Sequence, residues 1–157
     1  MDKLFIAADH AGFNLKEEVK TYFKTLSDFN KKWQLVDLGA EIMHQEDDYP
    51  EFSFKLGKEV RRSKKNLGIL ICRSGIGMSI AANKVLGIRA ALCTSVGQAV
   101  TSRAHNDCNV LVLASEINQE ENFRIIETFL GAEFSNEDRH RRRIEQIIEY
   151  EKGGRSH

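Results

Sequence analysis

The sequence predicts a doubly wound α/β fold, in which a parallel sheet is covered by helices on both faces. Short apolar or β-branched runs alternate with longer segments whose apolar residues recur at helical spacing. The runs at 67–71 and 110–113 are continuously apolar, as expected for strands buried on both faces. The chain has 157 residues, the size of one domain. We therefore expect a single domain over residues 1–152 in three layers, α/β/α, and a disordered tail over residues 153–157.

The individual elements follow from the same periodicity. We predict strands at 4–8, 35–38, 67–72, 88–93 and 110–113. We predict helices at 12–26, 49–62, 75–85, 95–104, 119–130 and 139–151. The first helix shows the helical apolar spacing at Phe13, Leu15, Val19, Tyr22 and Phe23. The last helix follows the fifth strand, with no obvious sheet surface left to cover, so we expect it to dock on a partner subunit.

Composition and charge exclude several classes of protein. Lys plus Arg and Asp plus Glu number 23 each, so no overall field directs the chain to nucleic acid or to an anionic membrane. No apolar run is long enough to span a membrane, and acidic residues within the first twenty positions argue against a signal peptide. Cys72, Cys93 and Cys108 form no pairing or zinc-site spacing. We expect reduced thiols, a cytoplasmic location and no bound metal.

Polar residues gather where a parallel sheet binds its ligands, beyond the carboxyl ends of the strands. Asp9 and His10 follow the first strand, the segment 72–79 follows the third, and Ser115 with Glu116 follows the fifth. The glycines in 72–79 permit a tight turn whose backbone N–H groups and helix N-terminus form an anion hole. Cys72 lies at its mouth, where the helix N-terminus favours thiolate. The alternatives are a merely structural turn and a buried cysteine with no chemical role.

Two further clusters could complete such a site. His105 and Asn106 precede the fifth strand and offer an acid, a base and hydroxyl-binding groups. Arg139 and Arg143 are four residues apart and share a helix face, which suits a phosphate. A solvated basic turn is the alternative for the arginines. Nucleic acid is a third interpretation, which the zero net charge and the lack of aromatic residues in this run disfavour.

These motifs together resemble the ribose-5-phosphate isomerase B family over residues from about 4 to 148. The segments that carry the resemblance are 6–12, 48–50, 72–77, 79–84, 87–90, Arg103, 105–107, Arg139, His140 and Arg143. The resemblance implies a Rossmann-like five-stranded fold and a homodimer with active sites shared between subunits, and leaves open whether dimers pair into tetramers. It implies isomerisation of ribose 5-phosphate and ribulose 5-phosphate through an enediolate, in the pentose phosphate pathway, without cofactor or metal.

The resemblance also implies residue roles. Cys72 would move the proton between C1 and C2, Ser74 would shuttle protons, and His105, aided by Asp9, would open the sugar ring. The backbone amides that would hold the enediolate oxygen belong to Gly75, Ile76, Gly77, Met78 and Ser79. The residues that would contact the sugar are Tyr49 and Asn106, and those that would hold the phosphate are His10, Arg139 and Arg143.

Two residues depart from the family pattern. Arg73 stands where glycine is usual, and Glu116 stands where an arginine that assists with phosphate is common. A carboxylate at position 116 would repel phosphate, and Arg73 could compensate for it.

Two other functions stay open. One is isomerisation of a six-carbon sugar phosphate, such as allose 6-phosphate or galactose 6-phosphate. The other is a non-catalytic sugar-phosphate binding module.

Overall fold

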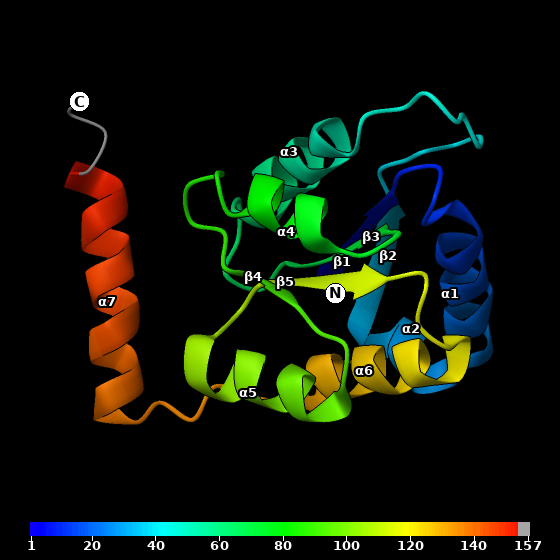
Figure 1. Ribbon diagram of the computed structural model, residues 1–157. Coiled ribbons are helices and arrows are strands. Elements are labelled where there is room, and N and C mark those ends of the chain that lie inside the picture. The colour runs from blue at the N-terminus through cyan, green and yellow to red at the C-terminus, as the bar shows by residue number, and fades with distance from the viewer. Residues whose placement is uncertain (154–157) are drawn as a thin grey trace.

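The computed structural model describes residues 1–153 and shows a five-stranded parallel sheet between two layers of helices (Figure 1). The strands are β1 (Asp2–Ala8), β2 (Trp33–Asp37), β3 (Leu67–Cys72), β4 (Ala90–Leu92) and β5 (Val110–Ala114), in the order β2-β1-β3-β5-β4. The helices are α1 (Phe13–Thr25), α2 (Ser27–Lys32), α3 (Tyr49–Val60), α4 (Ile76–Ala82), α5 (Val96–Asn106), α6 (Gln119–Gly131) and α7 (Asp138–Gly153). The predicted fold class is confirmed.

Each face of the sheet has its own apolar core because side chains alternate along a strand. Leu4, Ile6 and Ala8 of β1 pack with residues of α1, α5 and α6 on one face. Phe5 and Ala7 pack with residues of α3 and α4 on the other face. Figure 1 shows α3 and α4 on one side of the strands and α5 and α6 on the opposite side.

The strand register brings three loops together at one edge of the sheet. Ala8 of β1 pairs with Ile71 of β3, and Cys72 pairs with Ala114 of β5. The loops beyond these ends are also bonded to each other, since the Ser115 N–H donates to the Cys72 carbonyl at 2.9 Å. The strand ends therefore meet as the sequence predicts.

Most element bounds differ from the expected ones by a few residues, and three differences are larger or concern a whole element. The helix α2 was not predicted: it is a single short stretch with Asp28 in its first turn and Lys31 in its last, and Phe29 stacks on Phe23 at 3.9 Å between ring centroids. The fourth strand is shorter than predicted and covers only residues 90–92. Gly153 is the last residue of α7, so the expected tail cannot begin there, and the rest of that tail lies outside the described residues.

The helix α7 stands beside the rest of the fold, next to α5 (Figure 1). His140 and Ile144 are its buried residues, whereas Ile147 and Tyr150 expose 46% and 77% of their surface. Large apolar side chains left this exposed on one helix indicate an interaction surface. None of the helices within residues 1–153 is long and apolar enough to cross a membrane.

Candidate active site

The predicted anion hole is a tight turn between β3 and α4. Gly75 has φ of +78°, in the left-handed region, and a Cβ there would lie 2.4 Å from Leu92 Cδ1. Its N–H donates to Cys72 Sγ at 3.2 Å. Glycine is therefore required both for the backbone conformation and for the space. The turn holds the Cys72 sulfur against backbone donors, as the sequence predicts.

Burial acts more strongly on the Cys72 thiol than those donors do. Desolvation raises its pKa, and the N–H groups of Met78, Gly75 and Ser74 lower it by less, while the nearby Asp9 carboxylate raises it further. The pKa of Cys72 is therefore above its ordinary value. The N–H groups at the start of α4 act in the direction expected of a helix N-terminus, which favours thiolate, but burial outweighs them.

Tyr49 covers the turn from the first position of α3. A Cβ on Gly77 would lie 2.5 Å from Tyr49 Cζ, so the phenol ring rests directly on the backbone at Gly77. Ser53, one turn further along α3, donates from Oγ to the Met78 carbonyl at 3.3 Å. Tyr49 and the turn thus form one wall.

The other residues of the turn take different positions. Ser74 Oγ accepts from the Ile76 N–H at 3.3 Å, and the Ile76 side chain is 57% exposed. The Met78 side chain is fully buried in the core, so only its main chain can serve a ligand. The Ser79 N–H donates to the Gly75 carbonyl at 3.0 Å, within the first turn of α4.

Asp9 and His10 lie beside Cys72, at the end of β1. Asp9 Oδ1 accepts from the Gly12 N–H at 3.0 Å, and a Cβ on Gly12 would lie 2.2 Å from the Ile71 carbonyl oxygen. Asp9 is buried, and desolvation raises its pKa despite that hydrogen bond and the His10 charge. This close packing of the 9–12 turn on β3 fixes the Asp9 carboxyl near the Cys72 thiol.

Asp47, which the sequence did not single out, contacts His10. His10 Nδ1 lies 2.7 Å from Asp47 Oδ1, and this contact raises the pKa of His10. Asp9, His10 and Asp47 offer ligand atoms within 4.8 Å of one another. Because His10 Nδ1 is already bonded to Asp47, the group has the geometry of an ion pair, and we assign no metal to it. The available signal for Asp47 was its place in the loop after the second strand, at the same sheet edge as Asp9.

Arg73 and Glu116 line one cavity with Asp9 and His10, of about 680 Å³. The Glu116 N–H donates to the Arg73 carbonyl at 3.2 Å, so the two loops run side by side. Arg73 is exposed, and its charge lowers the pKa of His10. Within residues 1–153, positive φ at a non-glycine residue occurs at Asp107 and Asn136 alone, so Arg73 replaces glycine without backbone strain.

His105 and Asn106 lie at the opposite edge of the sheet. They are the last residues of α5, just before β5 begins. The Asn106 carbonyl accepts from Nε of Arg89, the residue immediately before β4, at 2.8 Å. Cys72 pairs with the last residue of β5, about 13 Å along that strand. One chain therefore does not bring His105 and Asn106 to Cys72, although both clusters border the sheet as predicted.

The second cluster is built around an ion-pair network. Asp107 carries φ of +44° and caps the C-terminus of α5; its carboxylate accepts from Arg89 at 3.1 Å and from Arg103 at 2.9 Å. The His105 ring lies 4.3 Å from the ring of His140 on α7. Arg89 and Arg103 were not predicted to have a role, and here they hold the backbone that carries His105.

Arg139 and Arg143 belong to this second cluster through α7. Arg139 Nε donates to Glu137 at 2.9 Å, and both arginines are exposed. His10 lies at the carboxyl edge of the sheet, so the expected three-residue phosphate site is divided between the two edges. We call the two groups of expected site residues half-sites, one at each edge of the sheet.

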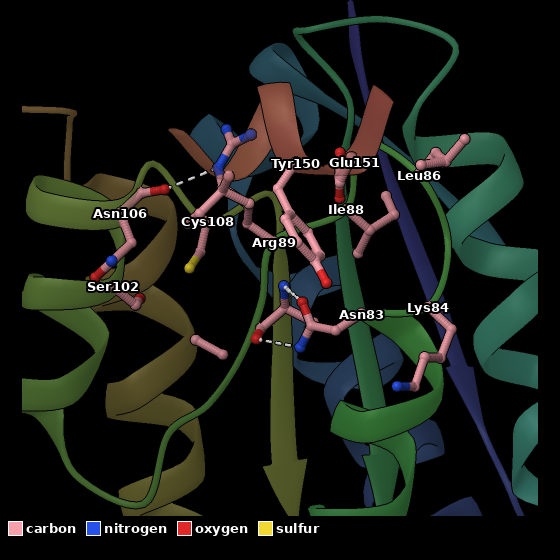
Figure 2. A pocket seen from close by; sticks show the side chains of 13 residues that line it. Asn83, Lys84, Leu86, Ile88, Arg89, Ser102, Asn106, Cys108, Tyr150 and Glu151 are labelled. Carbon is pink, nitrogen blue, oxygen red and sulfur yellow. Dashed lines mark hydrogen bonds between the residues drawn. The ribbon is translucent and has the colours of Figure 1, made fainter. Parts of the chain in front are cut away.

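An apolar groove runs along the second half-site, between α7, α5 and the segment that leads into β4 (Figure 2). Figure 2 shows Tyr150 and Glu151 of α7 near Ile88, with Arg89 between Tyr150 and Asn106. Asn83 closes the floor by bonding both the N–H and the carbonyl of Ala90, each at 2.9 Å. Polar side chains of the second cluster thus border an apolar surface.

The fold and the first half-site define a class: α/β proteins that bind a small anionic ligand beyond the carboxyl ends of a parallel sheet. A family model described as Ribose/Galactose Isomerase matches residues 4–147. The chain belongs to that family, which confirms the resemblance seen in its motifs.

Individual relatives agree. The chain is 44% identical over 151 residues to a probable ribose-5-phosphate isomerase B of Mycoplasma genitalium, covering 95% of each. It is 35% identical over 158 residues to ribose-5-phosphate isomerase B of Escherichia coli strain K12, covering 96% of this chain and 97% of that one. The crystal structure of the Mycoplasma genitalium enzyme with bound ribulose-5-phosphate matches with a TM-score of 0.88 at 42% identity, covering 96% of this chain and 97% of that one.

Proposed function

We propose that this chain is an aldose–ketose isomerase that interconverts ribose 5-phosphate and ribulose 5-phosphate. Family membership supports the reaction class, and the relatives at 44% and 35% identity bear this activity in their names. The observation in the chain itself that carries the proposal is the Cys72 thiol, held 3.2 Å from the Gly75 N–H beside Asp9. A base next to backbone donors suits proton removal beside a carbonyl.

The reaction is written with these groups as follows. His105, aided by Asp9, opens the sugar ring by moving the proton of the anomeric hydroxyl to the ring oxygen. The Cys72 thiolate takes the proton from C2, and the electron pair forms the C1–C2 double bond of an enediolate. Ser74 transfers the proton from O2 to O1, and the Cys72 thiol returns its proton to C1, which leaves the ketone at C2. Each N–H aimed at the enediolate oxygen contributes about 3 kcal/mol to the transition state.

The divided site supports a homodimer with shared active sites. Cys72 and His105 lie at opposite sheet edges of one chain, so a single chain does not supply all the proposed groups to one substrate. A second copy docked on the groove and on α7 would bring its His105, Asn106, Arg139 and Arg143 to the first chain's Cys72 and His10. The exposed Ile147 and Tyr150 favour such an interface.

The first experiment is turnover by the purified chain without added metal or nucleotide. We expect ribulose 5-phosphate to form from ribose 5-phosphate, with allose 6-phosphate and galactose 6-phosphate turned over less efficiently. A higher kcat/KM for a six-carbon substrate would replace the proposed sugar. Binding without turnover of any of the three would instead make the chain a sugar-phosphate binding module.

The three buried, free cysteines support our proposal that the enzyme works in the reducing cytoplasm.

Arg73 is proposed to offset the repulsion between Glu116 and the phosphate. We expect Arg73→Gly to raise KM for ribose 5-phosphate about fivefold with little change in kcat, because Arg73 is exposed and its charge is screened by water. The control is Arg62→Gly, which removes the same charge from the far end of α3. Steady-state kinetics at fixed ionic strength measure KM and kcat of both variants. An unchanged KM in Arg73→Gly would refute the compensation.

A further inference from the structure

Asp47 holds His10 by two hydrogen bonds to one oxygen atom. It lies in the loop between β2 and α3, 37 residues from His10. Its Oδ1 accepts from the His10 backbone N–H at 3.0 Å and lies 2.7 Å from His10 Nδ1. An ionised carboxylate can only accept, so Nδ1 must carry a proton. The main chain and the ring of His10 are thus both fixed by a single carboxylate.

The arrangement leaves the other ring nitrogen of His10 for a ligand. His10 lines the cavity shared with Arg73 and Glu116, and 38% of its side chain is exposed. With Nδ1 bonded to Asp47, protonation of the ring makes Nε2 a donor. A protonated imidazole fixed in this way is suited to an anion in the cavity.

The Asp47 carboxylate is in an environment that is costly for a charge. Only 12% of its side chain is exposed, and its Oδ2 is buried without a hydrogen-bond partner among residues 1–153. A buried carboxylate with one unsatisfied oxygen lowers the stability of a fold, so its presence calls for an explanation other than stability. A neutral side chain could join the loop to the end of β1 without this cost. The position therefore indicates a role for the charge itself.

The charges that face His10 come from each neighbouring loop. The hydrogen bond that His10 donates to Asp47 has the largest effect and raises the pKa of His10; the Asp9 charge raises it further, while partial burial and Arg73 lower it. Glu116, from the loop after β5, lines the same cavity. The net direction is upward, so the imidazole keeps its positive charge to a higher pH than an ordinary histidine.

We propose that Asp47 is a positioning residue, which orients the His10 imidazole and maintains it as a cationic donor to the substrate phosphate. This proposal rests on the proposed function, in which His10 holds that phosphate. Asp47 is not among the residues that line the cavity, and it acts through His10.

The test compares Asp47→Asn with Glu46→Gln, which removes the adjacent, exposed charge of the same loop. The probe is sulfate, a dianion over the whole pH range used, with binding measured by calorimetry. We expect Asp47→Asn to weaken sulfate binding about fivefold near pH 7.5. The difference should disappear near pH 5.5, where His10 is protonated in both the wild type and the variant. Glu46→Gln should bind sulfate as tightly as the wild type does at both pH values. With ribose 5-phosphate, Asp47→Asn should raise KM with little change in kcat.

The direction of the pH effect on anion affinity follows from the pKa of His10. Its raised pKa means that anion affinity is full at low pH and is lost as pH rises through that pKa, so removing the Asp47 charge moves the loss to lower pH. A merely structural role would weaken binding equally at both pH values and would overturn the proposal.

Nitrogen-15 NMR of His10 in the wild type gives a test that needs no variant to fold. We expect the neutral ring to be protonated at Nδ1 and the pKa to exceed the ordinary 6.5. A ring protonated at Nε2 with an ordinary pKa would overturn the proposal. Sulfate binding and NMR require no turnover, so a failure to isomerise ribose 5-phosphate would count against the proposed function and not against Asp47.

Discussion

Replacing Cys72 by alanine is expected to lower kcat for ribose 5-phosphate about 10³-fold, equivalent to about 4 kcal/mol of transition-state stabilisation. The substitution removes the group proposed to carry the proton between C2 and C1. The backbone N–H groups of the turn remain in place, because Gly75 and Gly77, and not the Cys72 sulfur, determine the conformation of the turn. We therefore expect KM to change little. Coupled detection of ribulose 5-phosphate measures both constants.

Cys93 offers a matched control for that experiment. It is a buried, free cysteine in the core on the opposite face of the sheet, and burial raises its pKa as it does for Cys72. Cys93→Ala removes the same atoms from a comparable environment, so it should leave kcat within about twofold of the wild type. Equal losses in the two variants would contradict a specific role for Cys72.

The pH dependence of kcat/KM provides a second readout of Cys72. Because burial raises the pKa of the thiol above its ordinary 9.0, the thiolate fraction grows with pH throughout the neutral and mildly alkaline range. We expect kcat/KM, which reports groups of the free enzyme, to rise from about pH 7 to pH 9. A plateau already present at neutral pH would show that the thiol ionises below its ordinary value.

The limits of prediction from sequence differ between the fold and the site. Strands such as β3 and the glycine turn after Cys72 are determined by local patterns: a continuous apolar run, then residues that permit positive φ. The pairing of His10 with Asp47 depends on a loop without periodicity, 37 residues away, and no spacing rule reaches that far. The net pKa direction of Cys72 required the depth of its burial, which a sequence pattern does not state.

The position of His105 illustrates the same limit in another way. Its place before the fifth strand puts it at the amino edge of a parallel sheet, opposite the edge at which Cys72 ends its strand. The sequence pattern thus contained the separation of the two half-sites. It did not contain how α7 and the ion pairs of Asp107 would hold His105 beside a docking surface.

The divided site predicts complementation between two severely impaired variants. Cys72→Ala alone should keep about a thousandth of the wild-type kcat, and His105→Ala alone should be impaired to a similar degree. If each active site combines Cys72 of one chain with His105 of its partner, a mixed dimer has one site with both defects and one site with neither. Random re-pairing makes half of the molecules mixed, so the mixture should recover about a quarter of the wild-type activity.

A single-chain site would behave differently, because every chain in the mixture would still lack one group and no activity would return. The matched control mixes Cys72→Ala with Cys72→Ser, which share the defective half-site and should stay inactive in any pairing. Dilution and brief exposure to mild denaturant allow subunit exchange before the assay. Activity that rises with exchange time in the first mixture, and not in the second, would establish that the enzyme requires the groups of two chains at one substrate.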